Sequence, residues 1–224
     1  GSALHRRDEA GASLDDVRAF HRDYYGPNNA VLAIAGDVTP AQGFALARRY
    51  FGDIPARPTP PRPDYREGLN TREVRLQQSD ALAQVPALAV GWKMPDRGSR
   101  DQAPMAVLGA LLANGEASRL HQGLVKERQL ALNVDSLYGL TSAWEYDGPT
   151  LFVVFALYKP DHDADAVLSG IDAEIARVAS EGVDAATLAR VKTQLLAQWY
   201  DGLEMFLDRA DALAKLQALW GDAQ

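Results

Sequence analysis

The sequence of 224 residues contains no cysteine, so its fold uses no disulfide. A metal ion would therefore have to be held by His, Asp or Glu side chains. Long apolar runs are missing as well, because the longest, Leu151–Tyr158, is far shorter than the roughly 20 residues of a membrane-spanning helix. We therefore expect a chain that folds around its own core and does not insert into a membrane.

An excess of positive charge is also absent. The 23 Lys and Arg residues are outnumbered by 30 Asp and Glu residues, which gives a formal net charge of −7. Surfaces that bind nucleic acid usually carry a stripe of Lys and Arg that neutralises phosphates, and none is visible here. We therefore expect no nucleic acid among the partners.

Motifs that carry catalytic chemistry are scarce. The sequence has four histidines, His5, His21, His121 and His162. No two of them are four residues apart, the spacing that places two imidazoles on one helical face around a metal. Without cysteine or a Gly-x-Ser-x-Gly sequence, no nucleophile is indicated either. We interpret His21 as a surface histidine and residues 161–163 as a solvated helix start, and we expect no catalytic residue and no metal ligand in this chain.

What is present begins with a short unit over residues 13–54, which reads as helix, strand, helix. Ser13 is a good N-cap, and Thr39 followed by Pro40 is typical of a second helix start. The apolar run at residues 30–35 predicts a strand buried on both faces. Such a strand needs hydrogen-bond partners, so we expect it to join the sheet of the following unit, in its own chain or in a neighbour's. Residues 1–12 are predicted to be a disordered end or a cloning remnant.

Proline marks the next boundary. Five of the twelve prolines fall within residues 55–63, which predicts an extended linker over residues 55–72. Strands are predicted beyond it at residues 73–76, at 85–92 and twice within 132–158, around a turn at 147–149. Helices are predicted at residues 101–113, 118–128, 163–180, 184–200 and 203–220. This order predicts an α+β fold for residues 73–224, with helices covering one face of a largely antiparallel sheet.

Two groups of residues carry a family resemblance. The first contains Tyr25-Gly26-Pro27-Asn28-Asn29-Ala30, Gly36-Asp37-Val38 and Tyr50-Phe51-Gly52-Asp53-Ile54-Pro55, and the second contains Leu108-Gly109-Ala110-Leu111-Leu112, Gly115 and Ser118-Arg119-Leu120. In this order, with a proline linker between them, they resemble the end of the first lobe and most of the second lobe of the pitrilysin/insulinase zinc peptidases. The resemblance implies the metallopeptidase-lobe fold of LuxS and the mitochondrial processing peptidases.

The same resemblance implies that the two lobes have different functions. Family members bind zinc in the first lobe, through an inverted H-x-x-E-H helix and a downstream Glu, and these positions are expected to lie upstream of Gly1. Zinc is thus expected in the parent protein, a zinc metalloendopeptidase, and no cofactor in this chain. The chain is expected to be an inactive lobe, truncated at its C-terminus, that shapes a peptide-binding chamber. Its expected partners are its own upstream catalytic lobe, a homologous subunit and a peptide substrate.

The resemblance also places two substrate-binding positions. In many relatives the second lobe supplies an Arg and a Tyr to the substrate backbone, and these positions fall on Val125 and Leu132. A charged hydrogen bond of this kind is worth about 1.5–3 kcal/mol, and neither side chain can form it. Arg128, one helical turn from Val125, is a weak candidate replacement, and a homologous partner subunit is another source of the missing pair. The alternatives are an assembly subunit of the same fold without proteolytic activity, and an unrelated α+β domain that binds a small molecule.

Overall fold

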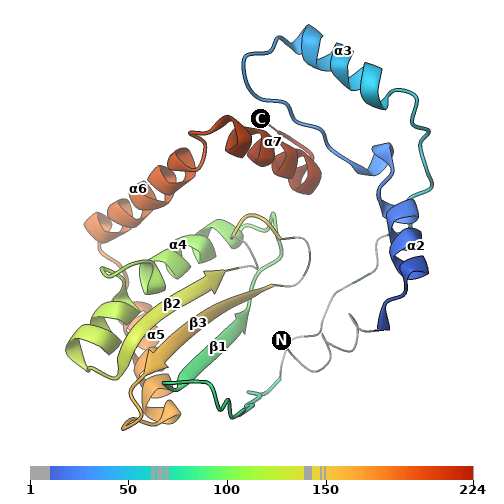
Figure 1. The fold of residues 1–224 in the computed structure, drawn as a ribbon. Helices are drawn as coiled ribbons and strands as arrows, with labels where there is room; N and C mark the ends of the chain where they lie inside the picture. The colour runs from blue at the N-terminus through green and yellow to red at the C-terminus, as the bar shows by residue number, and fades with distance from the viewer. Residues whose placement is uncertain are drawn as a thin grey trace. The chain divides into compact units, whose positions relative to one another are not determined.

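The computed structural model describes residues 11–61, 64, 68, 71–138, 143–146, 148 and 150–223. The chain divides into two compact units, one formed by residues 1–64 and 202–224 and the other by residues 65–201 (Figure 1). His5, most of the predicted disordered end, part of the predicted linker, and Asp147 and Pro149 of the predicted turn lie outside the described residues. The predicted limits of the linker and of the disordered end stay predictions.

The first unit is built from short amphipathic helices: α2 (Leu14–Tyr24), the 3-10 turn η1 (Pro27–Asn29), α3 (Pro40–Phe51) and α7 (Phe206–Trp220). The predicted caps are present. The Ser13 hydroxyl accepts a hydrogen bond from the Asp16 amide at 3.2 Å, and the Asp16 carboxylate accepts one from the Ser13 amide at 2.8 Å. The hydrogen bonds that the Ser13 hydroxyl and the Ser13 amide donate to the Asp16 carboxylate lower the pKa of Asp16. The helix starts are therefore fixed by local sequence alone.

Two predicted strands are wrong. Residues 30–35 and 73–76 adopt no strand pairing with any described residue, and their apolar side chains face solvent, Leu32 with 57% and Leu76 with 94% of its surface exposed. Residues 30–35 thus join no sheet among the described residues of their own chain, and pairing with the sheet of a neighbouring molecule stays a prediction. The reason is that an apolar run supplies strand propensity, whereas a strand exists only where another strand accepts its hydrogen bonds.

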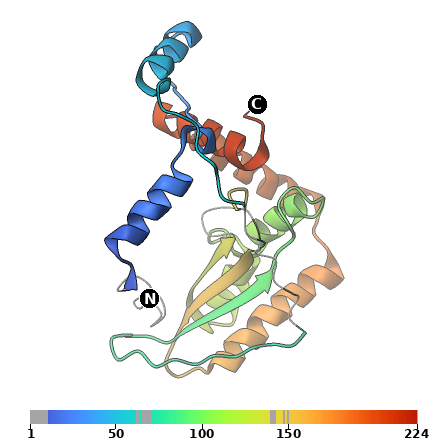
Figure 2. The ribbon, with the colours of Figure 1, turned by 90° about the vertical axis from the view of Figure 1, so that its right-hand side faces the viewer.

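The second unit contains the sheet and its helices. Its elements are β1 (Ala87–Lys93), α4 (Gln102–Ala113), the π-helix η2 (His121–Glu127), β2 (Ala131–Tyr138), β3 (Leu151–Tyr158), α5 (Ala164–Glu181) and α6 (Ala185–Asp201). The three strands are antiparallel in the order β1-β3-β2. Figures 1 and 2 show α4 and α5 on the same side of these strands. The predicted α+β fold with helices on one face of an antiparallel sheet is confirmed.

The core of this unit lies between the central strand and the helices. On β3, Phe152, Val154, Ala156 and Tyr158 are buried, and the residues between them face the other way. The buried side chains pack against Leu124 of η2, Ile171 of α5 and their neighbours. None of the described helices combines the length and the apolar character needed to span a bilayer.

The helix predicted at residues 118–128 is wound as a π-helix over most of its length. The Arg128 amide donates to the Gly123 carbonyl five residues back, at 3.1 Å. The chain then turns through Gln129, whose φ of 53° lies in the left-handed region. This conformation costs a residue with a Cβ roughly 1–2 kcal/mol, and glycine avoids that cost. The turn from η2 into β2 therefore stores backbone strain at one residue.

Replacement of Gln129 by glycine is expected to stabilise the second unit by about 1 kcal/mol, because glycine adopts a positive φ without a steric penalty. Chemical denaturation followed by circular dichroism measures the change in the free energy of unfolding. Gln129→Ala is the matched control, since it removes the same side-chain amide and keeps the Cβ, and it should give no stabilisation. Equal effects of the two substitutions would show that the strain at this position is not relieved by glycine.

A buried carboxylate ties η2 to α5. Glu174 of α5 is 1% exposed, and its Oε1 lies 2.9 Å from Nη2 of Arg128, while Nη1 of Arg128 donates to the Gly170 carbonyl at 3.1 Å. Arg177 adds a longer ion pair to Glu174 at 3.8 Å. The carboxylate fits only because residue 123 is glycine, since a Cβ there would lie 2.6 Å from Oε1 of Glu174. Charge pairing and close packing thus depend on one another at this contact.

Replacement of Glu174 by glutamine is expected to lower the free energy of unfolding by about 2 kcal/mol, because it leaves the Arg128 guanidinium against a neutral buried group. The value is below that of a fully buried pair because Arg128 itself is partly exposed. Glu181→Gln is the control on the same helix, where an exposed pair with Arg177 should contribute less than about 0.5 kcal/mol. Equal losses in the two variants, measured by chemical denaturation, would contradict a structural role for the buried pair.

Candidate functional site

The three residues singled out from the sequence lie around the turn from η2 into β2, in different surroundings. Val125 is half-buried and packs against the core, whereas Leu132 is exposed on β2, where the register shifts between Ala131 and Asn133. The guanidinium of Arg128 is directed at α5, where it binds Gly170 and Glu174. The structure therefore gathers no Arg and Tyr pair at these positions, and a substrate-binding role for Arg128 stays a prediction.

The described histidines lie on separate elements. His21 on α2 stacks against Tyr25 with 5.1 Å between ring centroids, His121 lies on η2, and His162 precedes α5. Among the residues that the structure describes, no group of three or more His, Asp or Glu side chains is placed to hold a metal ion. The donor set of the described residues therefore does not fit a zinc ion.

The face of the sheet opposite the helices carries apolar side chains. Leu151, Val153, Phe155 and Leu157 of β3 point to this side, with Phe155 43% exposed. Small residues of β1 lie beside them, because Ala89 is paired with Phe155 and Gly91 with Val153. We call this surface the open sheet face. Contiguous apolar surface of this kind commonly marks a site of contact with a peptide or a protein.

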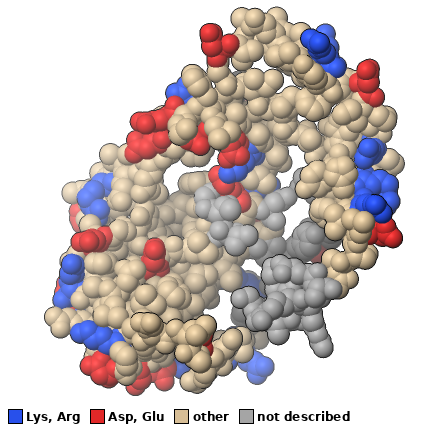
Figure 3. Space-filling model, in the orientation of Figure 1, with Lys and Arg blue, Asp and Glu red and all other residues tan. Residues whose placement is uncertain are grey.

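Charged side chains do not form a broad single-sign field around this surface. In the view of Figure 3, Lys and Arg side chains are interspersed with Asp and Glu side chains among the described residues. On the open sheet face itself, the residue of β2 paired with Phe155 is Asp135. A ligand of this face would therefore be recognised through apolar contact and a few local charges.

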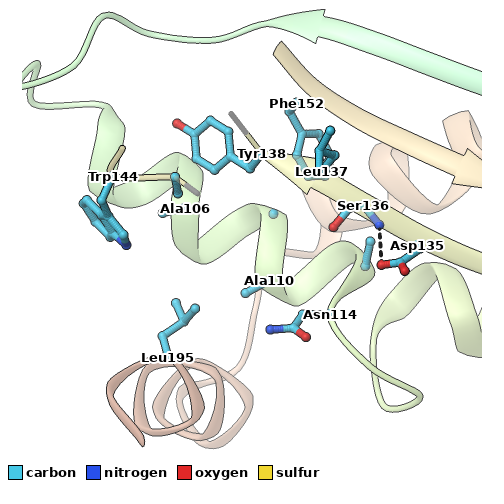
Figure 4. A pocket seen from close by; sticks show the side chains of 13 residues that line it. Ala106, Ala110, Asn114, Asp135, Ser136, Leu137, Tyr138, Trp144, Phe152 and Leu195 are labelled. Carbon is cyan, nitrogen blue, oxygen red and sulfur yellow. Dashed lines mark hydrogen bonds between the residues drawn. The ribbon is translucent and has the colours of Figure 1, made fainter. Parts of the chain in front are cut away.

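A groove of about 270 Å³ lies beside β2, between this strand and helices α4 and α6 (Figure 4). Four consecutive residues of β2, 135–138, line it on one side. Small residues of α4 form its floor: Ala106, Gly109, Ala110 and Ala113. Trp144, Leu195 of α6 and Asn114 at the end of α4 complete its walls.

Two tyrosines near the groove are held in their neutral form. The Tyr146 hydroxyl donates to the Pro95 carbonyl at 2.9 Å, and burial raises the pKa of Tyr146. Burial also raises the pKa of Tyr138, which lines the groove. Neither phenol therefore supplies a negative charge at neutral pH, and Asp135 is the one charged residue among the described residues that line the groove.

Sequence reasoning missed both surfaces, although each had a signal. The open sheet face follows from the continuous apolar run of β3, once only one of its two faces is covered. The floor of the groove follows from small residues at positions i, i+3, i+4 and i+7 of α4, which form one stripe along a helix. What the sequence could not supply is which element lies opposite each of them.

Comparison with known proteins agrees with the fold. The family described as "Peptidase M16 inactive domain" matches residues 11–195. Zinc protease PqqE of Helicobacter pylori is 27% identical over 90% of this chain and 45% of its own length. An uncharacterized zinc protease of Streptomyces coelicolor, SCO5738, is 29% identical over 94% of this chain and 45% of its own length. The chain thus spans less than half the length of these bacterial relatives.

Solved structures give the same fold. The crystal structure of a protease from Helicobacter pylori matches 95% of this chain and 51% of its own, with a TM-score of 0.75 and 22% identity. A peptidase M16 inactive domain from Pseudomonas fluorescens matches 95% of this chain and 48% of its own, with a TM-score of 0.69 and 18% identity. The resemblance to pitrilysin/insulinase peptidases is confirmed, and the chain belongs to the peptidase M16 inactive-domain family.

Proposed function

We propose that this inactive domain forms one wall of the peptide-binding chamber of a zinc protease, and that its open sheet face contacts the peptide. Membership of the inactive-domain family supports a catalytic domain as its partner within the parent protein. The relatives named zinc proteases, of which this chain covers less than half, support a zinc ion held outside the chain.

The observation that carries the proposal is the uneven covering of the sheet. Helices bury one side of β3, and the other side leaves Phe155 and its apolar neighbours exposed. A domain with this face turned to a chamber binds extended or unfolded peptide through side-chain contact, which orients the peptide without chemical participation. Cleavage itself would be carried out by the zinc-bound water of the catalytic domain.

Val125 and Leu132 limit the contribution of this domain to apolar contact with the peptide. Neither residue can hydrogen-bond a peptide backbone through its side chain, and Arg128 is already paired with Glu174. In the proposed assembly, polar contacts to the substrate backbone therefore come from another domain or from a homologous partner subunit. This domain contributes apolar contact area and shape.

The proposal predicts a selective loss of peptide cleavage when the open sheet face is made polar. In the full-length protein that contains this chain, Phe155→Asp is expected to lower kcat/KM for an unstructured peptide about tenfold, because apolar contact with the ring is lost and a charge is introduced. The zinc content and the melting temperature should stay unchanged.

Leu196→Asp is the matched control, because Leu196 is 57% exposed on α6 and lies away from the sheet. Equal activity of the two variants would overturn the proposal. If Phe155→Asp instead dissociated a complex with a partner subunit and left cleavage unchanged, the face would serve assembly, which is the alternative function of this fold.

A further inference from the structure

We propose that Asn114, at the end of α4, is a site of spontaneous deamidation, and that the reaction adds a second carboxylate to the groove beside β2. The reactants are the chain itself and water. This inference goes beyond the proposed function and does not depend on it, because it concerns the chemistry of one Asn-Gly pair. It assigns a modification site to the turn that follows α4.

The sequence singles out this position among the asparagines. Asparagine is one of the thermally labile residues of proteins, and its deamidation depends on the residue that follows it. A following glycine has no Cβ to shield its backbone nitrogen and adopts conformations that other residues avoid. Asn114 is the one asparagine of the sequence that precedes glycine, since the others, Asn28, Asn29, Asn70 and Asn133, precede Asn, Ala, Thr and Val.

The reaction joins the backbone nitrogen of Gly115 to Cγ of Asn114. This nitrogen loses its proton to a base, attacks Cγ and expels the side-chain amide nitrogen as ammonia, which leaves a succinimide ring. Water then opens the ring at either of its carbonyls. Opening at one carbonyl gives aspartate, and opening at the other gives isoaspartate, in which the backbone runs through Cγ. The chain thus loses ammonia and gains water, and no oxidant or reductant takes part.

The first structural support is the exposure of the attacking nitrogen. The Asn114 backbone amide donates the last hydrogen bond of α4, to the Ala110 carbonyl at 3.1 Å. The next amide, that of Gly115, donates no hydrogen bond to any described residue. Gly115 is exposed, its φ is 76°, and a Cβ built on it would have no atom within 4 Å. Base therefore has access to this nitrogen.

The second support is the weak hold on the side chain. Nδ2 of Asn114 donates to Oε1 of Gln198 at 3.3 Å, and this hydrogen bond lies at the surface. The ψ of Asn114 is 105°, which turns the Gly115 nitrogen away from Cγ, so attack requires rotation about the Cα–C bond. The rotation disturbs the turn in which the Ser118 amide donates to the Gly115 carbonyl at 3.1 Å. We therefore expect deamidation by local opening of this turn, at a lower rate than in the unfolded chain.

The other described asparagines provide internal comparisons. The Asn28 side chain is held at both ends, because its Nδ2 donates to the Arg57 carbonyl and its Oδ1 accepts from the Arg57 amide, each at 2.9 Å. Asn133 lies within β2 and precedes a β-branched valine. Neither combines an exposed following amide with a glycine, so both are expected to react far more slowly than Asn114.

Conversion of Asn114 would change the groove and the helix together. Asn114 and Asp135 both line the groove, so a carboxylate at position 114 would give it a second negative charge (Figure 4). The new charge also lies at the C-terminus of α4, where the helix dipole disfavours anions. Isoaspartate in addition lengthens the backbone by a methylene group before the turn. We therefore expect the modified chain to be less stable than the unmodified chain.

The test incubates the folded 224-residue chain at neutral and at alkaline pH and maps deamidation by tryptic digestion and mass spectrometry. Modification of Asn114 is expected to be at least about tenfold faster than that of Asn133 in the same sample, because glycine leaves the attacking nitrogen unshielded. Both aspartate and isoaspartate should form at position 114. The rate should rise with pH, since the attacking nitrogen must lose its proton.

Two variants separate the chemistry from its effect on stability. Asn114→Gln lengthens the side chain by one methylene, which disfavours closure of the succinimide ring, and should show no modification at this position. Asn114→Asp reproduces one product without incubation and is expected to melt about 1–4 °C below Asn114→Gln, because its charge opposes the dipole of α4.

Three results would overturn the inference: equal rates at Asn114 and Asn133 in the folded chain, modification of Asn114 only after a denaturant is added, or aspartate formed without any isoaspartate. The last result would indicate direct hydrolysis of the side-chain amide without attack by the Gly115 nitrogen. These measurements follow the chain's own peptides, so they stay decisive if either variant fails to fold.

Discussion

The second unit depends on the packing of one face of β3 beneath three helical segments. This strand is hydrogen-bonded on both sides, by β1 and by β2, and its alternate side chains Phe152, Val154 and Ala156 are buried under α4, η2 and α5. Because side chains alternate along a strand, this burial necessarily turns Val153 and Phe155 to the other face. The core and the proposed contact surface are therefore two sides of the same eight residues.

The chain belongs to a family described as an inactive domain. The described residues bring no metal-binding group together, and the buried polar side chains serve packing instead: Glu174 fixes η2 against α5 through Arg128. Val125, one of the two substrate-binding positions implied by the family resemblance, is half-buried and packs against the core. In the proposed chamber, the open sheet face is the part of this domain that contacts the peptide.

The helices could be predicted from the sequence because their signals are local: Ser13 and Asp16 cap α2 within four residues of one another. The strand at residues 30–35 could not be excluded, because its existence depends on a partner that the local sequence does not identify. The groove was beyond sequence reasoning for the same reason, since Ala110, Ser136 and Leu195 come together from three separate elements. The π-helical winding of η2 and the left-handed Gln129 had no distinguishing pattern.

The hydrogen bond from the Ser136 amide to Asp135 has a consequence for selectivity. Asp135 occupies a backbone donor on the exposed margin of the sheet, so any incoming strand competes with a carboxylate that is already in place. A neutral, strand-forming segment, including another molecule of the same protein, would displace that carboxylate and leave its charge uncompensated. This local charge disfavours indiscriminate pairing of neutral strands with the margin of the sheet.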